Sequence, residues 1–142
     1  MAQHTLQTIP AELRNNIYEL AFTSDQEGPI EFCKAAPPSN ALLLACKQIH
    51  NEAVQIYRAA YHRYWSTSEF VIDILESDLT DDEKAAIRRI HPQDVERIPS
   101  LILTNHTAAW RLENNGRTEV MTPRFDEDNH ELYVVVKTRT RG

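Results

Sequence analysis

Asp73 is the residue of this sequence whose setting most suggests acid–base chemistry. It lies in the apolar run "EFVIDIL" (residues 69–75). Burial among apolar groups disfavours the charged form of a carboxyl, which suits it to proton transfer near neutral pH. If this run is a strand, Asp73 shares a face with Val71 and Leu75, and His50 is a candidate partner. The pair would fit a cofactor-free isomerase, cyclase or dehydratase acting on a small molecule. The other interpretation places Asp73 in solvent on a half-covered sheet.

Cys46 and His50 are four residues apart, so on a helix both side chains would reach one zinc ion. A zinc site needs further ligands, and no second pair with suitable spacing accompanies them. A free cysteine on an apolar helix face is typically a core residue. We therefore predict no metal and no cofactor.

The composition argues against several classes of partner. The 142-residue chain has a formal net charge of -6, which disfavours binding to nucleic acid. No apolar run approaches the roughly 20 residues that a membrane span needs. The two cysteines are too few for a secreted disulfide scaffold, and the first residues do not match a signal peptide. We expect a cytoplasmic or nuclear protein that binds neither nucleic acid nor membranes.

The stretch "IPAELRNNIYEL" (residues 9–20) predicts a first helix over Pro10–Ala21. Proline suits the first helical turn, where its missing N–H would be unpaired anyway. The apolar residues recur at helical spacing and form what we call the apolar stripe: Leu13, Ile17, Leu20 and Ala21. The polar residues are expected on the opposite side: Arg14, Asn15, Asn16 and Glu19.

A long helix is predicted from Asn40 to Trp65, with Ser39 as its N-cap, because this range contains neither glycine nor proline. One face carries apolar residues at helical spacing, namely Leu42, Cys46, Ile49, Ala53, Ile56 and Ala60. We expect Ile49, Ala53 and Ile56, at the centre of this face, to be buried.

The second half reads as strands around a short helix. "EFVIDIL", "IPSLILT" and "ELYVVVKTRT" predict strands, and Asn115-Gly116 predicts a hairpin turn between two more. Thr80 and Glu83 form a capping-box pattern for a helix that ends near Ile90. The predicted fold class is α+β, with N-terminal helices packed on a small, mostly antiparallel sheet.

Two segments together resemble the fungal F-box-like domains. "IPAELRNNIYEL" matches that family's first helix, of the form P-x-E-L-R-x-x-I-Y-E. "ALLLACKQIHNEA" matches its second, in which a leucine run is followed by cysteine, a basic residue, Q-I and E-A. The resemblance covers roughly residues 6–75. We expect one α+β domain over 1–142, with an F-box-like helical part (1–65) and a strand-rich part (66–142).

The resemblance also implies a function. F-box helices dock on the adaptor subunit of a cullin-based ubiquitin ligase, so the chain would be a non-enzymatic protein-interaction module. The residues carried over as adaptor contacts are Ile9, Pro10, Leu13, Ile17 and Leu20. The same apolar stripe would also arise if it packed only against the long helix. The sequence leaves both alternatives open.

Overall fold

The computed structural model describes residues 5–74, 79–105, 108–114, 118–125 and 131–136. Its helices and mixed sheet confirm the predicted α+β class. The chain forms two compact units, which are described in turn. The first unit comprises residues 1–26 and 36–65, and the second comprises residues 27–35 and 66–142.

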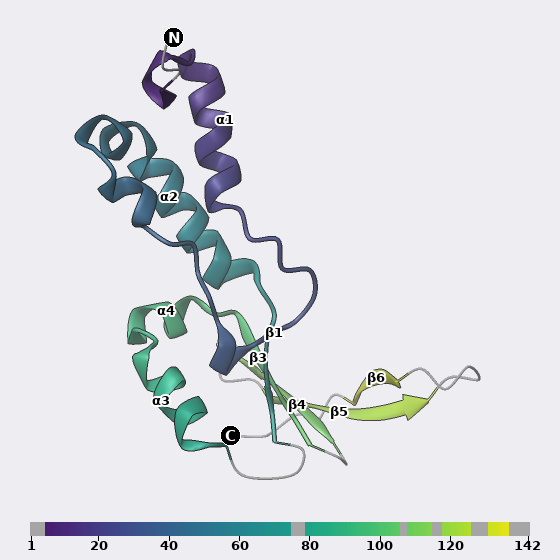
Figure 1. The fold of residues 1–142 in the computed structure, drawn as a ribbon. Helices are drawn as coiled ribbons and strands as arrows, with labels where there is room; N and C mark the ends of the chain where they lie inside the picture. Colours follow the sequence, from purple (N-terminus) through teal and green to yellow (C-terminus); the bar gives the residue numbers. More distant parts are fainter. Residues whose placement is uncertain (1–4, 75–78, 106–107, 115–117, 126–130, 137–142) are drawn as a thin grey trace. The chain divides into compact units, whose positions relative to one another are not determined.

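The first unit is helical (Figure 1). Its elements are the 3₁₀ turn η1 (Leu6–Thr8), the helix α1 (Ala11–Phe22), the 3₁₀ turn η3 (Ala41–Leu44) and the long helix α2 (Lys47–Thr67). α1 lies alongside α2, and buried side chains from α1, η3 and α2 form the core between them: Tyr18, Phe22, Leu43, Ile49 and Ala53. The ring of Phe22 meets that of Tyr57 edge-on, with centroids 5.3 Å apart.

The long helix is shorter at its start than predicted. Residues 41–44 form η3, and α2 begins only at Lys47. Ser39 is therefore not the N-cap of α2; its hydroxyl oxygen instead accepts a hydrogen bond from the Ala41 N–H at 3.2 Å. The expected burial of Ile49 and Ala53 is confirmed, whereas Ile56 is only partly buried.

The second unit holds a six-stranded sheet and two short helices. The strands are β1 (Ile30–Glu31), β2 (Phe70–Asp73), β3 (Ser100–Thr104), β4 (Ala109–Glu113), β5 (Thr118–Phe125) and β6 (Glu131–Val136). They lie in chain order across the sheet. The first two pairings are parallel and the last three antiparallel, so the sheet is mostly antiparallel, as predicted.

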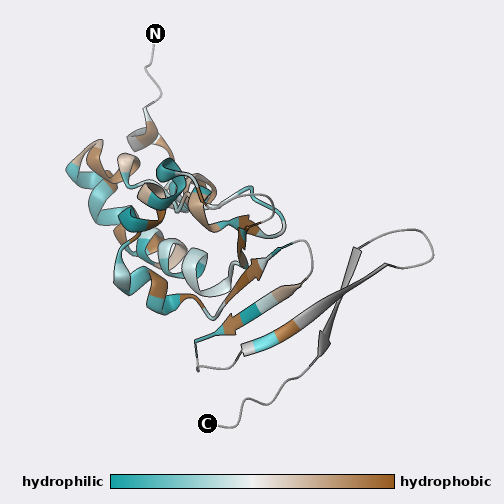
Figure 2. Ribbon diagram, turned by 90° about the horizontal axis from the view of Figure 1, so that it is seen from below, coloured by the Kyte–Doolittle hydropathy of each residue, from teal (hydrophilic) through white to brown (hydrophobic). Residues whose placement is uncertain are grey.

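The register sorts the side chains into two faces. Val71, Ile102 and Arg111 lie opposite one another on β2, β3 and β4, whereas Phe70, Leu101 and Leu112 form the neighbouring row. Successive side chains of a strand point to opposite faces, so the two rows lie on opposite faces of the sheet. The first row includes the charge of Arg111, and the second is wholly apolar. Along β4, hydrophilic Arg111 and Glu113 alternate with hydrophobic Leu112. Figure 2 shows both hydrophobic and hydrophilic segments on the strands of the sheet.

The predicted capping box starts α3 (Asp81–Arg89). The Thr80 hydroxyl accepts from the Glu83 N–H at 3.2 Å, and the Glu83 carboxylate accepts from the Thr80 N–H at 2.8 Å. A further helix, α4 (Pro92–Arg97), is not among the predicted elements, because a proline just after Ile90 is also typical of the end of the preceding helix. Pro92 instead occupies the first turn of α4, and His91 Nδ1 accepts from the Gln93 N–H at 3.2 Å.

The short segment at residues 30–34 joins the sheet of the second unit. β1 pairs with β2, and the 3₁₀ turn η2 (Phe32–Lys34) follows it. The rings of Phe32 and Phe70 meet edge-on, with centroids 5.8 Å apart.

The predicted Asn115-Gly116 turn lies outside the described residues, although the strands on either side of it, β4 and β5, pair as expected. Within the described part of the chain, no helix is long and apolar enough to cross a membrane.

Candidate functional site

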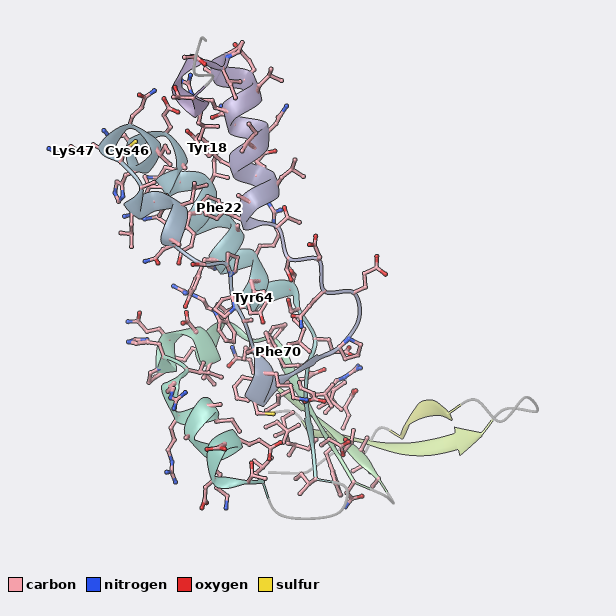
Figure 3. All side chains as sticks on the ribbon, viewed as in Figure 1. Tyr18, Phe22, Cys46, Lys47, Tyr64 and Phe70 are labelled. Atoms are coloured by element: carbon pink, nitrogen blue, oxygen red, sulfur yellow. The ribbon has the colours of Figure 1, made fainter. Side chains whose placement is uncertain are left out.

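α1 points its aromatic residues, not its apolar stripe, into the core. Arg14, Tyr18 and Phe22 recur every four residues and form its inward face. Tyr18 is fully buried and Phe22 nearly so. Figure 3 shows both side chains on the side of α1 that faces α2. Arg14, which the sequence placed on the polar side, instead lies half-buried between the two helices.

The apolar stripe faces solvent. Leu13 is 53% exposed, Ile17 38% and Leu20 76%, and Ala21 is exposed as well. Of the two alternatives left open by the sequence, packing of this stripe on the long helix is therefore wrong. The two large rings of Tyr18 and Phe22 bury more apolar area than the aliphatic residues would, so they take the inward position.

The residues before α1 continue the candidate surface. Pro10 is exposed at the N-cap of α1, and Ile9 before it is half-buried. The N-cap makes no side-chain hydrogen bond to the helix. The Ile9 carbonyl instead accepts a hydrogen bond from Arg14 Nη1 at 2.7 Å. Ile9, Pro10 and the apolar stripe thus belong to one helix and the turn that precedes it.

Glu52 of α2 anchors the inward face of α1. Its two carboxylate oxygens accept from Arg14 Nε at 2.9 Å and Nη2 at 2.8 Å. The Tyr18 hydroxyl donates to the same carboxylate at 2.9 Å, and Gln48 Nε2 donates at 3.0 Å. A bidentate arginine–carboxylate pair fixes direction as well as distance. The network therefore sets which side of α1 faces α2.

The hydrogen bonds of this network shift the pKa values of its members. Those donated by Arg14, Gln48 and Tyr18 lower the pKa of Glu52 to about 2, because they stabilise the carboxylate. The hydrogen bond to Glu52 raises the pKa of Arg14. Burial, followed by the hydrogen bond to Glu52, raises the pKa of Tyr18. All three groups are therefore held in one protonation state throughout the neutral range.

The charges that flank the exposed stripe are acidic. Glu12 and Glu19 are exposed on α1. Each directly precedes a stripe residue, Leu13 or Leu20, and so lies about 100° away from it around the helix. Arg14 is the single basic residue of α1, and Glu52 already neutralises it. A surface that binds the stripe would meet leucine and isoleucine side chains edged by carboxylates.

The residues of the acid–base alternative lie in different units. Asp73 is exposed at the end of β2 and accepts a hydrogen bond from the Thr104 hydroxyl at 3.1 Å. The burial that the acid–base prediction required is therefore not found at Asp73. His50 is exposed in the first turn of α2. Their pairing in a catalytic pocket stays a prediction.

The described residues contain no group of three or more histidine, cysteine or acidic side chains that would hold a metal ion. Cys46 is partly buried and packs against the core of the first unit. Its place beside Lys47, at the start of α2, is visible in Figure 3. His50 donates its backbone N–H to the Cys46 carbonyl at 3.0 Å, which is the ordinary helical bond.

Sequence reasoning identified the apolar stripe but missed Arg14 and Glu52. Both were part of the family resemblance, yet neither was given a role. The signal that would have found them is the spacing Arg14–Tyr18–Phe22, which makes a second stripe with a charged first member. Gln48 and Glu52, four residues apart, mark the matching site on α2.

Comparison with protein-family models, curated proteins and solved structures found no match to the chain.

Proposed function

We propose that the chain is a non-enzymatic protein-interaction module resembling the fungal F-box-like proteins, and that α1 docks on the adaptor subunit of a cullin ubiquitin ligase. The observation that supports the proposal is the exposure of Leu13, Ile17 and Leu20 on α1, which contributes other residues, Tyr18 and Phe22, to the core of the first unit. An amphipathic helix commonly binds a protein partner by laying such a stripe in an apolar groove.

The exposed stripe lies outside the hydrophobic core of the first unit. Tyr18 and Phe22 already close the core against α2. Leu20 leaves 76% of its surface in water, which is unfavourable for the isolated protein. Binding in a groove would bury that surface, and the transfer from water would drive association. This function would place the chain in the cytoplasm or the nucleus.

The test is calorimetric titration of the purified chain with the cullin-ligase adaptor. Two variants place a charge on the stripe where the helix dipole favours it: Leu13→Asp in the first turn and Leu20→Lys in the last. Both are expected to fold normally, because both side chains are exposed. Burying an unpaired charge costs several kcal/mol, so each variant should weaken binding by roughly a hundredfold or more.

Asn15→Asp is the matched control. It adds the same negative charge as Leu13→Asp to the same helix, at an exposed position away from the stripe. It should bind the adaptor within about threefold of wild type, since surface changes outside an interface cost little. Wild type that does not bind at micromolar concentration would end the proposal. Binding by Leu13→Asp and Leu20→Lys at the strength of Asn15→Asp would move the site away from the stripe.

A further inference from the structure

Arg14 makes three connections from one side chain. Its guanidinium holds Glu52 of α2 by two nitrogens, and its third nitrogen donates to the Ile9 carbonyl at 2.7 Å. The Arg14 N–H also donates to the Pro10 carbonyl at 3.0 Å. One residue of α1 therefore joins the helix, its neighbour α2 and the turn that precedes it.

Among the described residues, the turn before α1 is held chiefly by local hydrogen bonds. In η1, the Thr8 N–H donates to the Thr5 carbonyl at 2.9 Å and the Ile9 N–H to the Leu6 carbonyl at 3.3 Å. Both bonds are local, so neither fixes the turn to the rest of the unit. Pro10 has no N–H and supplies no side-chain cap. Leu6 packs on the core of the unit. Among the described side chains, the hydrogen bond from Arg14 to the Ile9 carbonyl is the polar contact that links this turn to α1.

We propose that Arg14 is the positioning residue of the candidate binding surface, and that it holds Ile9 and Pro10 in line with the apolar stripe. This inference rests on the proposed function, which makes Ile9, Pro10 and the stripe parts of one site. In this role Arg14 does not itself touch the partner. It acts through the Ile9 carbonyl, because Glu52 fixes the guanidinium plane and that plane fixes the turn.

Lysine at position 14 cannot replace arginine in this positioning role. A guanidinium presents five donors in a rigid fork, whereas an ammonium is a point charge on a flexible stem. An ammonium at position 14 can pair with Glu52, but it cannot at the same time reach Ile9 in a second fixed direction. Glu52 is itself held by Tyr18 and Gln48, so it does not move to compensate. Arg14→Lys therefore keeps the charge and releases the turn.

A double-mutant cycle on adaptor affinity tests this role. Arg14→Lys should weaken binding roughly tenfold, the loss of one hydrogen bond made by a charged group. Combined with Ile9→Ala, which removes the side chain being positioned, the same change should cost less than about threefold, because coupled sites are not additive. Combined with Leu20→Ala, at the far end of the stripe, it should cost the full tenfold. Equal losses in both combinations would overturn the inference and assign Arg14 a general structural role.

Amide hydrogen exchange provides a readout that needs no partner. In Arg14→Lys, the Thr8 and Ile9 amides should exchange at least roughly tenfold faster than in wild type, while Ala53 in the core of α2 stays protected. Glu52→Gln is the second variant, because it keeps Arg14 and removes the charge that orients it, and it should act on the same two amides. Unchanged exchange at Thr8 and Ile9 in both variants contradicts the inference. Failure of wild type to bind the adaptor instead contradicts the proposed function.

Discussion

α1 and α2 both carry apolar residues at helical spacing, but the stripe of α1 is exposed whereas that of α2 is buried or partly buried. Ile17 of α1 is 38% exposed, while Ile49 of α2 is 8% exposed. The difference lies in what else each helix offers. α1 has a competing face with two large rings and an arginine that finds a carboxylate across the interface. Apolar spacing alone therefore shows that a face exists, and the competition between faces decides which one is buried.

The largest expected difference in stability is between truncations on the two faces of α1. Phe22→Ala removes a buried ring that packs on Tyr57, so it should lower the free energy of unfolding by about 3–5 kcal/mol. Leu20→Ala, two residues away but exposed, should change it by no more than about 0.5 kcal/mol. Urea unfolding measures both. Equal losses would mean that the two faces of α1 share the core.

The two helices can also be compared by truncating an isoleucine in each stripe to alanine. Ile49→Ala in α2 should cost about 2–5 kcal/mol by lost burial and the cavity it leaves. Ile17→Ala in α1 should cost less than Ile49→Ala, because 38% of Ile17 is exposed, against 8% of Ile49. Thermal unfolding of the two variants beside wild type gives the ranking. A larger loss for Ile17→Ala would reverse our assignment of the two stripes.

A smaller effect concerns the charged anchor of the inward face. The pKa of Glu52 falls from an ordinary 4.5 to about 2 on folding, so its contribution to stability is complete above pH 4.5 and is lost as the pH falls toward 2. Glu52→Gln removes this titration. The variant should be less stable than wild type at pH 7, and the gap should narrow between pH 4.5 and 2.

Unfolding curves at several pH values follow that gap. Glu12→Gln, at an exposed position on α1, is the control and should leave the pH dependence close to that of wild type. A stability difference between Glu52→Gln and wild type that stays constant down to pH 2 would show that the carboxylate is not held by Arg14 and Tyr18.

Much of the fold could be predicted because local signals were strong. The box at Thr80 and Glu83 requires only neighbouring residues, and it is present as expected. α4 was missed because Pro92 is compatible with both the end of one helix and the start of another. The break before Lys47 has no glycine or proline to mark it. β1, two residues long, forms only because β2 is there to pair with it.

The candidate site was half predicted. The sequence identified the apolar stripe, since spacing is a local property. It could not decide the direction of the stripe, because that depends on how Tyr18 and Phe22 fit against α2. Arg14 was assigned to solvent for the same reason: its partner, Glu52, is 38 residues away in the chain.

The measurement that tests the account most directly is the alkylation rate of single cysteines in the folded protein. Cys33 and Cys46 are first replaced by serine, and cysteine is then placed at position 13, 20 or 49, in place of Leu13, Leu20 or Ile49. If the stripe is exposed, cysteines at positions 13 and 20 should be alkylated at rates within about tenfold of those in the unfolded chain. A cysteine at position 49 should be alkylated orders of magnitude more slowly, because it reacts only when the core opens. Protection of positions 13 and 20 equal to that of position 49 would show that the stripe is buried and contradict the account.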